Sequence, residues 1–390
     1  MVDKPCFTHF VVDDKFIPDS IKCFQDADLT VNKYYCLTKN PLTVKYINGT
    51  NVEYINIQQL ESVFDKLKDG DVVVLHCLYA LPAHFICKIP KDVKVVWYAW
   101  GFDIYSNGYP IRPLIALNEV LLPMTKSRMK YFLRLKDLFG KIRVIADNRG
   151  YHTKSSLLQY KAISRVDFFA GVFPSEYDML RQQCDFFQAR RITHNYIHPE
   201  EFALDNITEP CNVRGNNILL GNSAAYLCNH IDIMHSLYEQ TTQRDYNVYC
   251  PLSYGGNRYY INAVVKEGKA LFGDRFLPLL DYLPIDEYTK VIQSCSSIIL
   301  GYKQQAATCN CLTSLWNGLK VFLPKASMNF EEYRNVEGLR VYSIEEDLND
   351  TVLSTKPDFD ILEQRRILSE IYSYERWKKD LKESIEIMMS

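Results

Sequence analysis

Short apolar runs alternate with amphipathic stretches along the first two hundred residues of the chain. The runs are rich in Val and are bounded by turn residues, a pattern typical of buried parallel strands. We expect strands at Phe7 to Val12, Asp71 to His76, Val93 to Trp100, Arg143 to Ala146 and Phe168 to Phe173. Helices are expected between them, the first from Pro18 to Ala27. This alternation predicts a doubly wound α/β domain.

The pattern stops between Glu201 and Asn217, where polar, Gly and Pro residues dominate, and then resumes. The second series of strands is expected at Ile218–Leu220, Tyr246–Cys250, Phe276–Leu277, Ser297–Leu300 and Lys320–Leu323. We therefore expect an N-terminal Rossmann-like domain (residues 1–205), a linker (206–217) and a C-terminal Rossmann-like domain (218–360). A long helix within 361–390 could cross back to the first domain. Two such domains imply a ligand-binding cleft between them.

Two strand–turn–helix junctions in the second domain are candidates for a phosphate-binding site. Gly221-Asn222-Ser223 follows one strand and precedes a helix near His230, and Lys303-Gln304-Gln305 follows another strand. Helix N-termini and backbone N–H groups at one edge of a parallel sheet suit a diphosphate. Each junction alone is equally typical of an ordinary turn with a helix cap. The two together favour a binding site, with His230 placed to meet a phosphate.

Other candidates lie at strand ends. The loop around Leu283 could bind a nucleobase through its backbone groups. The aromatic run Trp97 to Tyr105 contains Asp103, and a carboxylate among aromatic rings suits carbohydrate binding and proton transfer. The alternative is a core strand followed by a capping Asp. His9 and His76 are each more typical of a hydrogen-bonded core histidine than of a catalyst.

Composition narrows the class of protein. With 390 residues and 47% hydrophobic content, the chain is expected to form two domains with sizeable cores. Its 12 cysteines show no zinc-binding spacing, which favours reduced, buried thiols in a cytoplasmic protein. No Asp-x-Asp follows a strand, so neither a divalent cation nor a cofactor is expected. No apolar stretch reaches 18 residues and no signal-peptide pattern is present, so a transmembrane helix is not expected.

The net charge of −2 conceals one basic segment. Residues 124–165 contain eleven Lys or Arg and two acidic residues, a balance of +9, which leaves −11 for the rest of the chain. Tyr131, Leu135, Leu138 and Ile142 share one helical face there, with basic residues opposite. Such a helix suits an anionic membrane, with Lys126, Arg128, Lys130, Arg134 and Lys141 as the binding residues. It equally suits a helix packed on a core with a solvated basic back, and nucleic acid is a weaker alternative.

Several of these residues recur in a known family pattern. They are Leu219 to Ser223, Asn229-His230-Ile231, Pro251 with Tyr254, Leu283 with Glu287-Tyr288, Gln304-Gln305 with Gly318, and the Trp97 to Tyr105 run. In them the chain resembles glycosyltransferase family 56, the TDP-4-acetamido-4,6-dideoxygalactose (N-acetylfucosamine):lipid II transferases. Lys303 departs from the pattern, which usually has Arg, and Ala306-Ala307-Thr308 replaces a loop richer in Gly.

The resemblance implies a GT-B architecture, with the acceptor on the N-terminal domain and the nucleotide-sugar donor on the C-terminal one. It implies metal-independent transfer of a deoxy sugar from a TDP-linked donor to a lipid-linked or cell-surface glycan, at the inner face of a bacterial inner membrane. The donor-binding residues would be Gly221, Asn222, Ser223, His230, Tyr254, Leu283, Lys303, Gln304 and Gln305. Trp100, Gly101 and Tyr105 would bind the acceptor. Asp103 would either contact the acceptor or act as the general base, with His9 and His76 as the alternatives.

Two other classes of protein remain open at this point. One is a nucleotide-sugar epimerase or hydrolase of the same fold, and the other is a non-catalytic subunit that binds a nucleotide sugar. An epimerase or hydrolase would have no use for a membrane-seeking helix.

Overall fold

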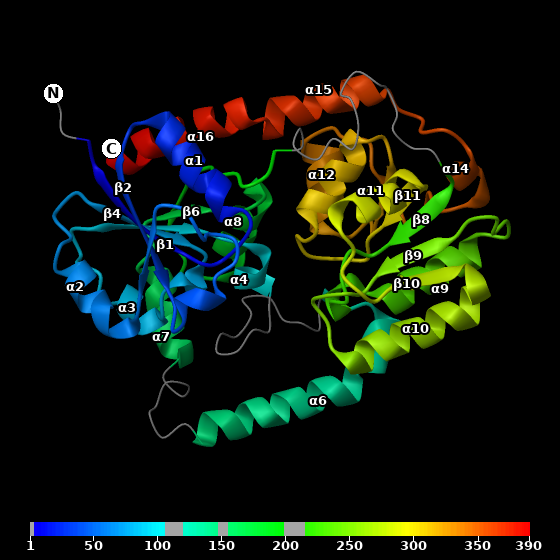
Figure 1. The fold of residues 1–390 in the computed structure, drawn as a ribbon, viewed down its shortest axis with the longest axis horizontal. Coiled ribbons are helices and arrows are strands. Elements are labelled where there is room, and N and C mark those ends of the chain that lie inside the picture. Colours follow the sequence, from blue (N-terminus) through cyan, green and yellow to red (C-terminus); the bar gives the residue numbers. More distant parts are fainter. Residues whose placement is uncertain (1–3, 106–119, 147–154, 199–214) are drawn as a thin grey trace. The chain divides into compact units, whose positions relative to one another are not determined.

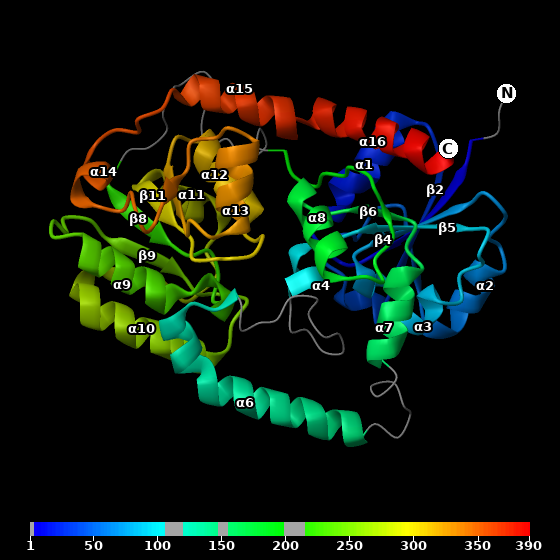
Figure 2. The ribbon, with the colours of Figure 1, turned by 180° about the vertical axis from the view of Figure 1, so that it is seen from behind.

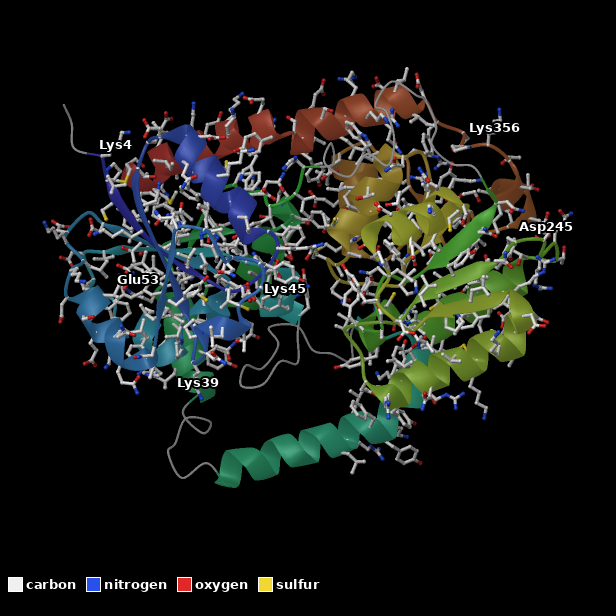
Figure 3. The ribbon with its side chains drawn as sticks, viewed as in Figure 1. Lys4, Lys39, Lys45, Glu53, Asp245 and Lys356 are labelled. Atoms are coloured by element: carbon white, nitrogen blue, oxygen red, sulfur yellow. The ribbon has the colours of Figure 1, made fainter. Side chains whose placement is uncertain are left out.

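A computed structural model describes residues 4–105, 120–146, 155–198 and 215–390 and divides the chain into two units. Unit 1 comprises residues 1–115, 140–197 and 374–390, and unit 2 comprises residues 116–139 and 198–373. Each unit is a parallel sheet with helices on both faces (Figure 1). Charged side chains such as Lys4, Glu53 and Asp245 lie on the surface of their own unit (Figure 3).

In the described part of unit 1 the sheet has seven parallel strands in the order β3-β2-β1-β4-β5-β6-β7. They are β1 Cys6–Val11, β2 Val31–Leu37, β3 Val52–Ile55, β4 Val72–His76, β5 Lys94–Tyr98, β6 Phe168–Ala170 and β7 Arg190–Arg191. Helices α1 (Ile17–Ala27) and α16 (Tyr374–Met389) pack together on one face, and α3 (Ala83–Ile86) and α7 (Ser155–Ser164) pack together on the other (Figure 1). The remaining described helices are α2 (Leu60–Phe64), α4 (Gly101–Tyr105) and α8 (Pro174–Gln183).

In the described part of unit 2 the sheet has six parallel strands in the order β10-β9-β8-β11-β12-β13. They are β8 Asn217–Leu220, β9 Val248–Pro251, β10 Phe276–Leu279, β11 Cys295–Ile299, β12 Lys320–Leu323 and β13 Tyr342–Ser343. Helices α9 (His230–Gln240) and α10 (Arg258–Phe272) cover one face, and α11 (Ile285–Gln293), α12 (Thr308–Trp316) and α15 (Ile361–Tyr372) cover the other (Figure 2). Unit 2 also contains α13 (Met328–Phe330), α14 (Asp350–Ser354) and the part of α6 (Pro123–Ala146) up to residue 139, whereas residues 140–146 of α6 belong to unit 1.

The order of the strands determines where each unit can bind a ligand. The central strands are continuous apolar runs, and β4 and β12 are buried along their whole length, as expected for strands covered on both faces. In unit 2 the chain order reverses between β8 and β11, which pair in parallel with Leu220 opposite Ile299. Crevices in such sheets lie outside the carboxyl ends of the strands at this switch point.

The structure differs from the sequence analysis in several elements. Arg143 to Ala146, expected as a strand, forms the end of α6, because an apolar run of three residues does not distinguish strand from helix. The helix expected at the C-terminus is interrupted at Ser373, which has an extended backbone (φ −61°, ψ 155°). Strands β2, β3, β7 and β13 were not predicted.

The two units also differ in extent from the expected domains. The basic segment was expected in the first domain, whereas the structure groups residues 116–139 with unit 2 because the start of α6 packs on α9 and α10. Residues 374–390 belong to unit 1. Most of the expected linker, residues 206–214, lies outside the described residues.

Candidate functional site

The candidate donor site begins at the turn after β8. Gly221 donates its N–H to the carbonyl oxygen of Ile299 at 2.8 Å, which fixes the turn against the end of β11. Its φ of +75° is left-handed, and a Cβ at this position would lie 2.5 Å from Nε2 of His230. Glycine is therefore required both by the backbone conformation and by the imidazole packed against the turn.

Side chains join this turn to the second predicted junction. The Tyr302 hydroxyl donates to Asn222 Oδ1 at 2.9 Å, and Asn222 Nδ2 donates to Asn310 Oδ1 at 3.3 Å. The Ser223 and Tyr302 hydroxyl oxygens lie 3.5 Å apart. Because Asn310 is in the first turn of α12, both junctions meet at one point on the edge of the sheet. The sequence analysis missed Tyr302 and Asn310, and their only signal was their position beside the strand and helix ends.

The loop between β11 and α12 is held by Asn329, which is buried. Its Oδ1 accepts the N–H of Ala306 at 3.2 Å and its Nδ2 donates to the carbonyl of Ala306 at 2.7 Å. Ala307, at the N-cap of α12, has a left-handed φ of +55° and provides no side-chain cap. A helix N-terminus that is fixed in place but not capped can bind an anion.

Gln304 and Gln305 lie in this loop and are both buried. Gln305 Nε2 donates to Thr308 Oγ1 at 2.5 Å, so this amide supports the start of α12. Gln304 Oε1 is buried and has no hydrogen-bond partner among the described residues. A buried amide oxygen without a partner is a candidate for accepting a hydrogen bond from a ligand. Lys303 is half-buried, and its carbonyl accepts the N–H of Met328 at 2.9 Å.

The other predicted donor residues differ in accessibility. His230 is fully buried, its Nδ1 lies 3.1 Å from the Tyr260 hydroxyl, and burial lowers its pKa to about 3. The imidazole is therefore neutral, and it supports the Gly221 turn without supplying a positive charge. Tyr254 is 57% exposed, while its carbonyl accepts the N–H of Ala224 at 2.7 Å. Leu283 is half-buried in the loop after β10.

In unit 1, Asp103 lies buried in the first turn of α4. Its Oδ2 accepts hydrogen bonds from Nε1 of Trp97 at 3.0 Å, from N of Leu78 at 3.1 Å and from N of Trp100 at 3.2 Å. Burial raises the pKa of Asp103 to about 7, although these hydrogen bonds act in the opposite direction. Oδ1 has no partner among the described residues. One carboxylate oxygen is thus committed to the fold and the other is not.

The bond from Leu78 holds a strained turn after β4. Cys77 has φ +100° and ψ 151°, a region of backbone space almost reserved for glycine. Strain of this kind costs about 1–3 kcal/mol and persists only where the surroundings enforce it. The contacts of Asp103 therefore indicate that it positions this turn.

His9 and His76 are both fully buried and do not face solvent. His9 Nδ1 lies 3.0 Å from His76 Nε2, His9 Nε2 lies 3.0 Å from Asn32 Oδ1, and His76 Nδ1 lies 3.0 Å from the Tyr196 hydroxyl. Burial lowers the pKa of His9 to about 3. Since every ring nitrogen has a partner, neither histidine is presented as an accessible base.

The predicted acceptor residues surround Asp103 in the core of unit 1. Trp100 and Tyr105 are buried, and the Tyr105 hydroxyl donates to Glu176 Oε1 at 3.1 Å. Gly101 begins α4. Trp100 and Tyr105 are therefore core residues of unit 1, and the backbone N–H of Trp100 bonds Asp103 directly.

The predicted membrane-binding residues Lys126, Arg128, Lys130 and Arg134 are exposed on α6, and the side chain of Lys141 lies outside the described residues. Arg128 is paired with Glu267 at 3.1 Å. Within the described residues, no helix has the length and apolar character needed to cross a membrane. The same residues contain no cluster of His, Cys, Asp or Glu suited to a metal ion.

Comparison with known proteins identifies the family. A family model described as 4-alpha-L-fucosyltransferase, glycosyl transferase group 56, matches residues 172–386, more than half of the chain. The chain belongs to this family. The resemblance found in the sequence is thereby confirmed, and the protein is a glycosyltransferase. No curated protein sequence matches the chain.

Solved structures of low sequence identity share the fold of this family 56 member. The N-terminal domain of Candida albicans trehalose-6-phosphate phosphatase aligns with a TM-score of 0.64 at 7% identity, over 99% of this chain and 97% of that one. Anabaena HepE in complex with UDP aligns with a TM-score of 0.63 at 9% identity, over 99% and 100%. The lipopolysaccharide outer core galactosyltransferase WaaB aligns with a TM-score of 0.59 at 8% identity, over 99% of each chain. The predicted GT-B fold, with two Rossmann-like units, is confirmed.

Proposed function

We propose that this glycosyltransferase moves a deoxy sugar from a TDP-linked donor to a lipid-linked glycan, as in O-antigen or capsule synthesis at the inner face of a bacterial inner membrane. The family description names a fucosyl group, which is a 6-deoxy sugar. Family membership favours sugar transfer over the epimerase, hydrolase and non-catalytic alternatives.

One observation carries the donor half of this proposal. Asn222, Tyr302 and Asn310 join the turn after β8 to the first turn of α12. A diphosphate bound there would meet the N–H groups of the turn and the positive end of the helix dipole. The amide of Gln304 would be available to the sugar or the phosphates, and Leu283 to the base.

In this proposal, backbone N–H groups stabilise the leaving diphosphate. Fixed N–H donors at a helix N-terminus stabilise a developing anion without reorganisation, which is the task of the cation in metal-dependent transferases. We therefore expect transfer to proceed at an unchanged rate in excess EDTA. A rate that falls in EDTA and recovers with Mg²⁺ would contradict this part of the proposal.

The acceptor half of the proposal places the sugar acceptor near Asp103 in unit 1. Because Oδ2 is occupied by three N–H donors, only Oδ1 is available for an acceptor hydroxyl. We propose that Asp103 orders the strained Cys77–Leu78 turn and lends Oδ1 to the acceptor.

A thermal-shift panel of TDP, UDP, GDP and their sugars tests the donor site. We expect TDP and TDP-sugars to stabilise the wild type and Asn216→Ala, and to stabilise Asn222→Ala much less. Asn216 is a matched control, since it is an exposed Asn of the same unit whose side chain, among the described residues, bonds only the carbonyl of Asp245. Equal shifts for Asn222→Ala and Asn216→Ala, or no nucleotide shift in the wild type, would overturn the proposed site. Release of TDP only when lipid-linked acceptor is present would support transfer.

A further inference from the structure

The start of α6 is fastened to the donor-binding unit by two buried side chains. Asp232 Oδ1 and Oδ2 accept the N–H groups of Met124 and Thr125, each at 2.8 Å, so a carboxylate caps the helix N-terminus. Asn229 accepts the N–H of Leu122 at 2.8 Å and donates to the carbonyl of Gly301 at 2.7 Å. The segment leading into α6 is thus tied to the strand end that carries the candidate donor site.

One face of α6 packs on unit 2. Thr125 and Met129 are fully buried, and Phe132 and Leu133 pack against the core of this unit. The rings of Phe132 and Tyr259 are stacked, with centroids 6.1 Å apart and 8° between their planes. Over this stretch the helix is therefore part of unit 2. Its packing on the core determines which residues of α6 point outward.

The outward faces combine apolar and basic side chains. Met124, Tyr131 and Leu135 are 40%, 71% and 54% exposed, and their spacing of i, i+7 and i+11 places them on one face. Lys126, Lys130 and Arg134 are exposed too, and none of them has an acidic partner among the described residues. A groove of about 510 Å³ borders the apolar face, with Met124, Tyr131, Ile231 and Tyr259 in its wall. Tyr131 and Leu135, the two members of the predicted apolar stripe whose side chains are described, thus face away from the core.

We propose that α6 lies on the surface of an anionic membrane, with Met124, Tyr131 and Leu135 at the headgroup boundary and Lys126, Lys130 and Arg134 on the anionic headgroups. An apolar stripe with a large aromatic residue beside unpaired cations matches the chemistry of such a surface. The proposal rests on the proposed function for its lipid-linked acceptor. It assigns the membrane contact to the donor-binding unit, whereas the sequence analysis expected it in the acceptor-binding domain.

Co-sedimentation of the full chain with vesicles tests this surface. We expect binding to vesicles of phosphatidylglycerol and phosphatidylethanolamine, and little binding to phosphatidylcholine. Each basic residue near an anionic surface contributes about a fivefold change in binding, so Lys126→Gln/Lys130→Gln/Arg134→Gln should weaken binding about 100-fold. Tyr131→Ser/Leu135→Ser should weaken it about tenfold or more.

The control removes the same charge elsewhere, through the exposed residues Lys66, Lys68 and Lys91 of unit 1, each changed to Gln. This control should bind vesicles nearly as well as the wild type. Equal losses in both triple variants, or no wild-type binding to anionic vesicles, would refute the surface. Loss of a dimer in Tyr131→Ser/Leu135→Ser would indicate self-association and would also refute it. The TDP thermal shift, measured without vesicles, should persist in all variants, so a failure of this proposal is distinguishable from a failure of the donor site.

Discussion

Replacing Gly221 by Ala tests the geometry on which the donor site depends. The alanine would have to adopt a φ of +75°, and its Cβ would lie 2.5 Å from Nε2 and 2.9 Å from Cδ2 of the buried His230 ring. The left-handed backbone costs about 1–2 kcal/mol for a residue with a Cβ, and the crowding of a packed interior costs about 1–3 kcal/mol more. We expect the free energy of unfolding of unit 2 to fall by about 2–5 kcal/mol. The Gly221→Ala protein should also lose most of the thermal shift that TDP produces in the wild type.

Gly338 provides the matched control for this change. It lies in the same unit with a φ of +74°, and a Cβ there would have no neighbour within 4 Å. Gly338→Ala should therefore show only the backbone cost, which leaves a difference of about 1–3 kcal/mol for the contact with His230. In the double variant Gly221→Ala/His230→Ala, the two costs should be less than additive because the contact is absent.

Native-state hydrogen exchange on peptides from β8 and β11 measures these free energies within unit 2. This measurement reports the opening of unit 2 alone. A global unfolding curve would not separate the two units, because they need not unfold in one step. The reasoning fails if Gly221→Ala and Gly338→Ala destabilise equally, or if His230→Ala adds its full cost to that of Gly221→Ala.

Three further predictions follow from individual contacts. The folded pKa of Asp103, about 7, lies above the ordinary 3.8, so the wild type should lose stability as the pH rises from about 4 to about 7. The total loss in the free energy of unfolding should be about 4 kcal/mol. Asp103→Asn should not show this pH-dependent loss. Because Oδ1 is proposed to bind the acceptor, the variant should raise the KM for the acceptor more than it lowers kcat, whereas loss of kcat with normal folding would restore Asp103 as a base. Asn329→Ala should lower the free energy of unfolding by about 2–3 kcal/mol, because it leaves the backbone N–H and carbonyl of Ala306 without partners. The control Asn335→Ala, at an exposed position, should lower it by less than about 0.5 kcal/mol. Urea titrations measure both. Asp232→Ala should speed hydrogen exchange at the start of α6 and lower the free energy of unfolding by about 1–2 kcal/mol. The control Asp274→Ala should have neither effect.

Much of unit 2 could be predicted because its central strands are short buried runs. β12 is predicted at its observed bounds, Lys320–Leu323, and β8 differs by one residue. β2 was missed because its first residues, from Val31 to Lys33, are polar or exposed near the edge of the sheet and give no continuous apolar run. Arg143 to Ala146 shows the reverse error, in which a short apolar run belonged to a helix.

The turn proposed to bind the donor could be located from the sequence, but the residues that it contacts could not. Asn222 lies 80 residues from Tyr302 and 88 from Asn310, so their contacts depend on how β8 and β11 pair. His230 was expected to meet a phosphate because it follows the turn closely. Its burial, which spacing does not reveal, makes it instead the packing partner that requires glycine at position 221.

The hydrogen bonds of the buried pair His9 and His76 determine which nitrogen of each ring carries the proton. Asn32 Oδ1 already accepts the Thr30 hydroxyl at 2.8 Å and also accepts from His9 Nε2 at 3.0 Å. His9 Nδ1 must then accept from His76 Nε2, and His76 Nδ1 must accept from Tyr196. The four groups form one directed chain of dipoles, with both imidazoles in the Nε2–H tautomer. Such a chain has a single self-consistent arrangement, and so it can specify how β1, β2 and β4 align where apolar contacts alone would tolerate alternatives.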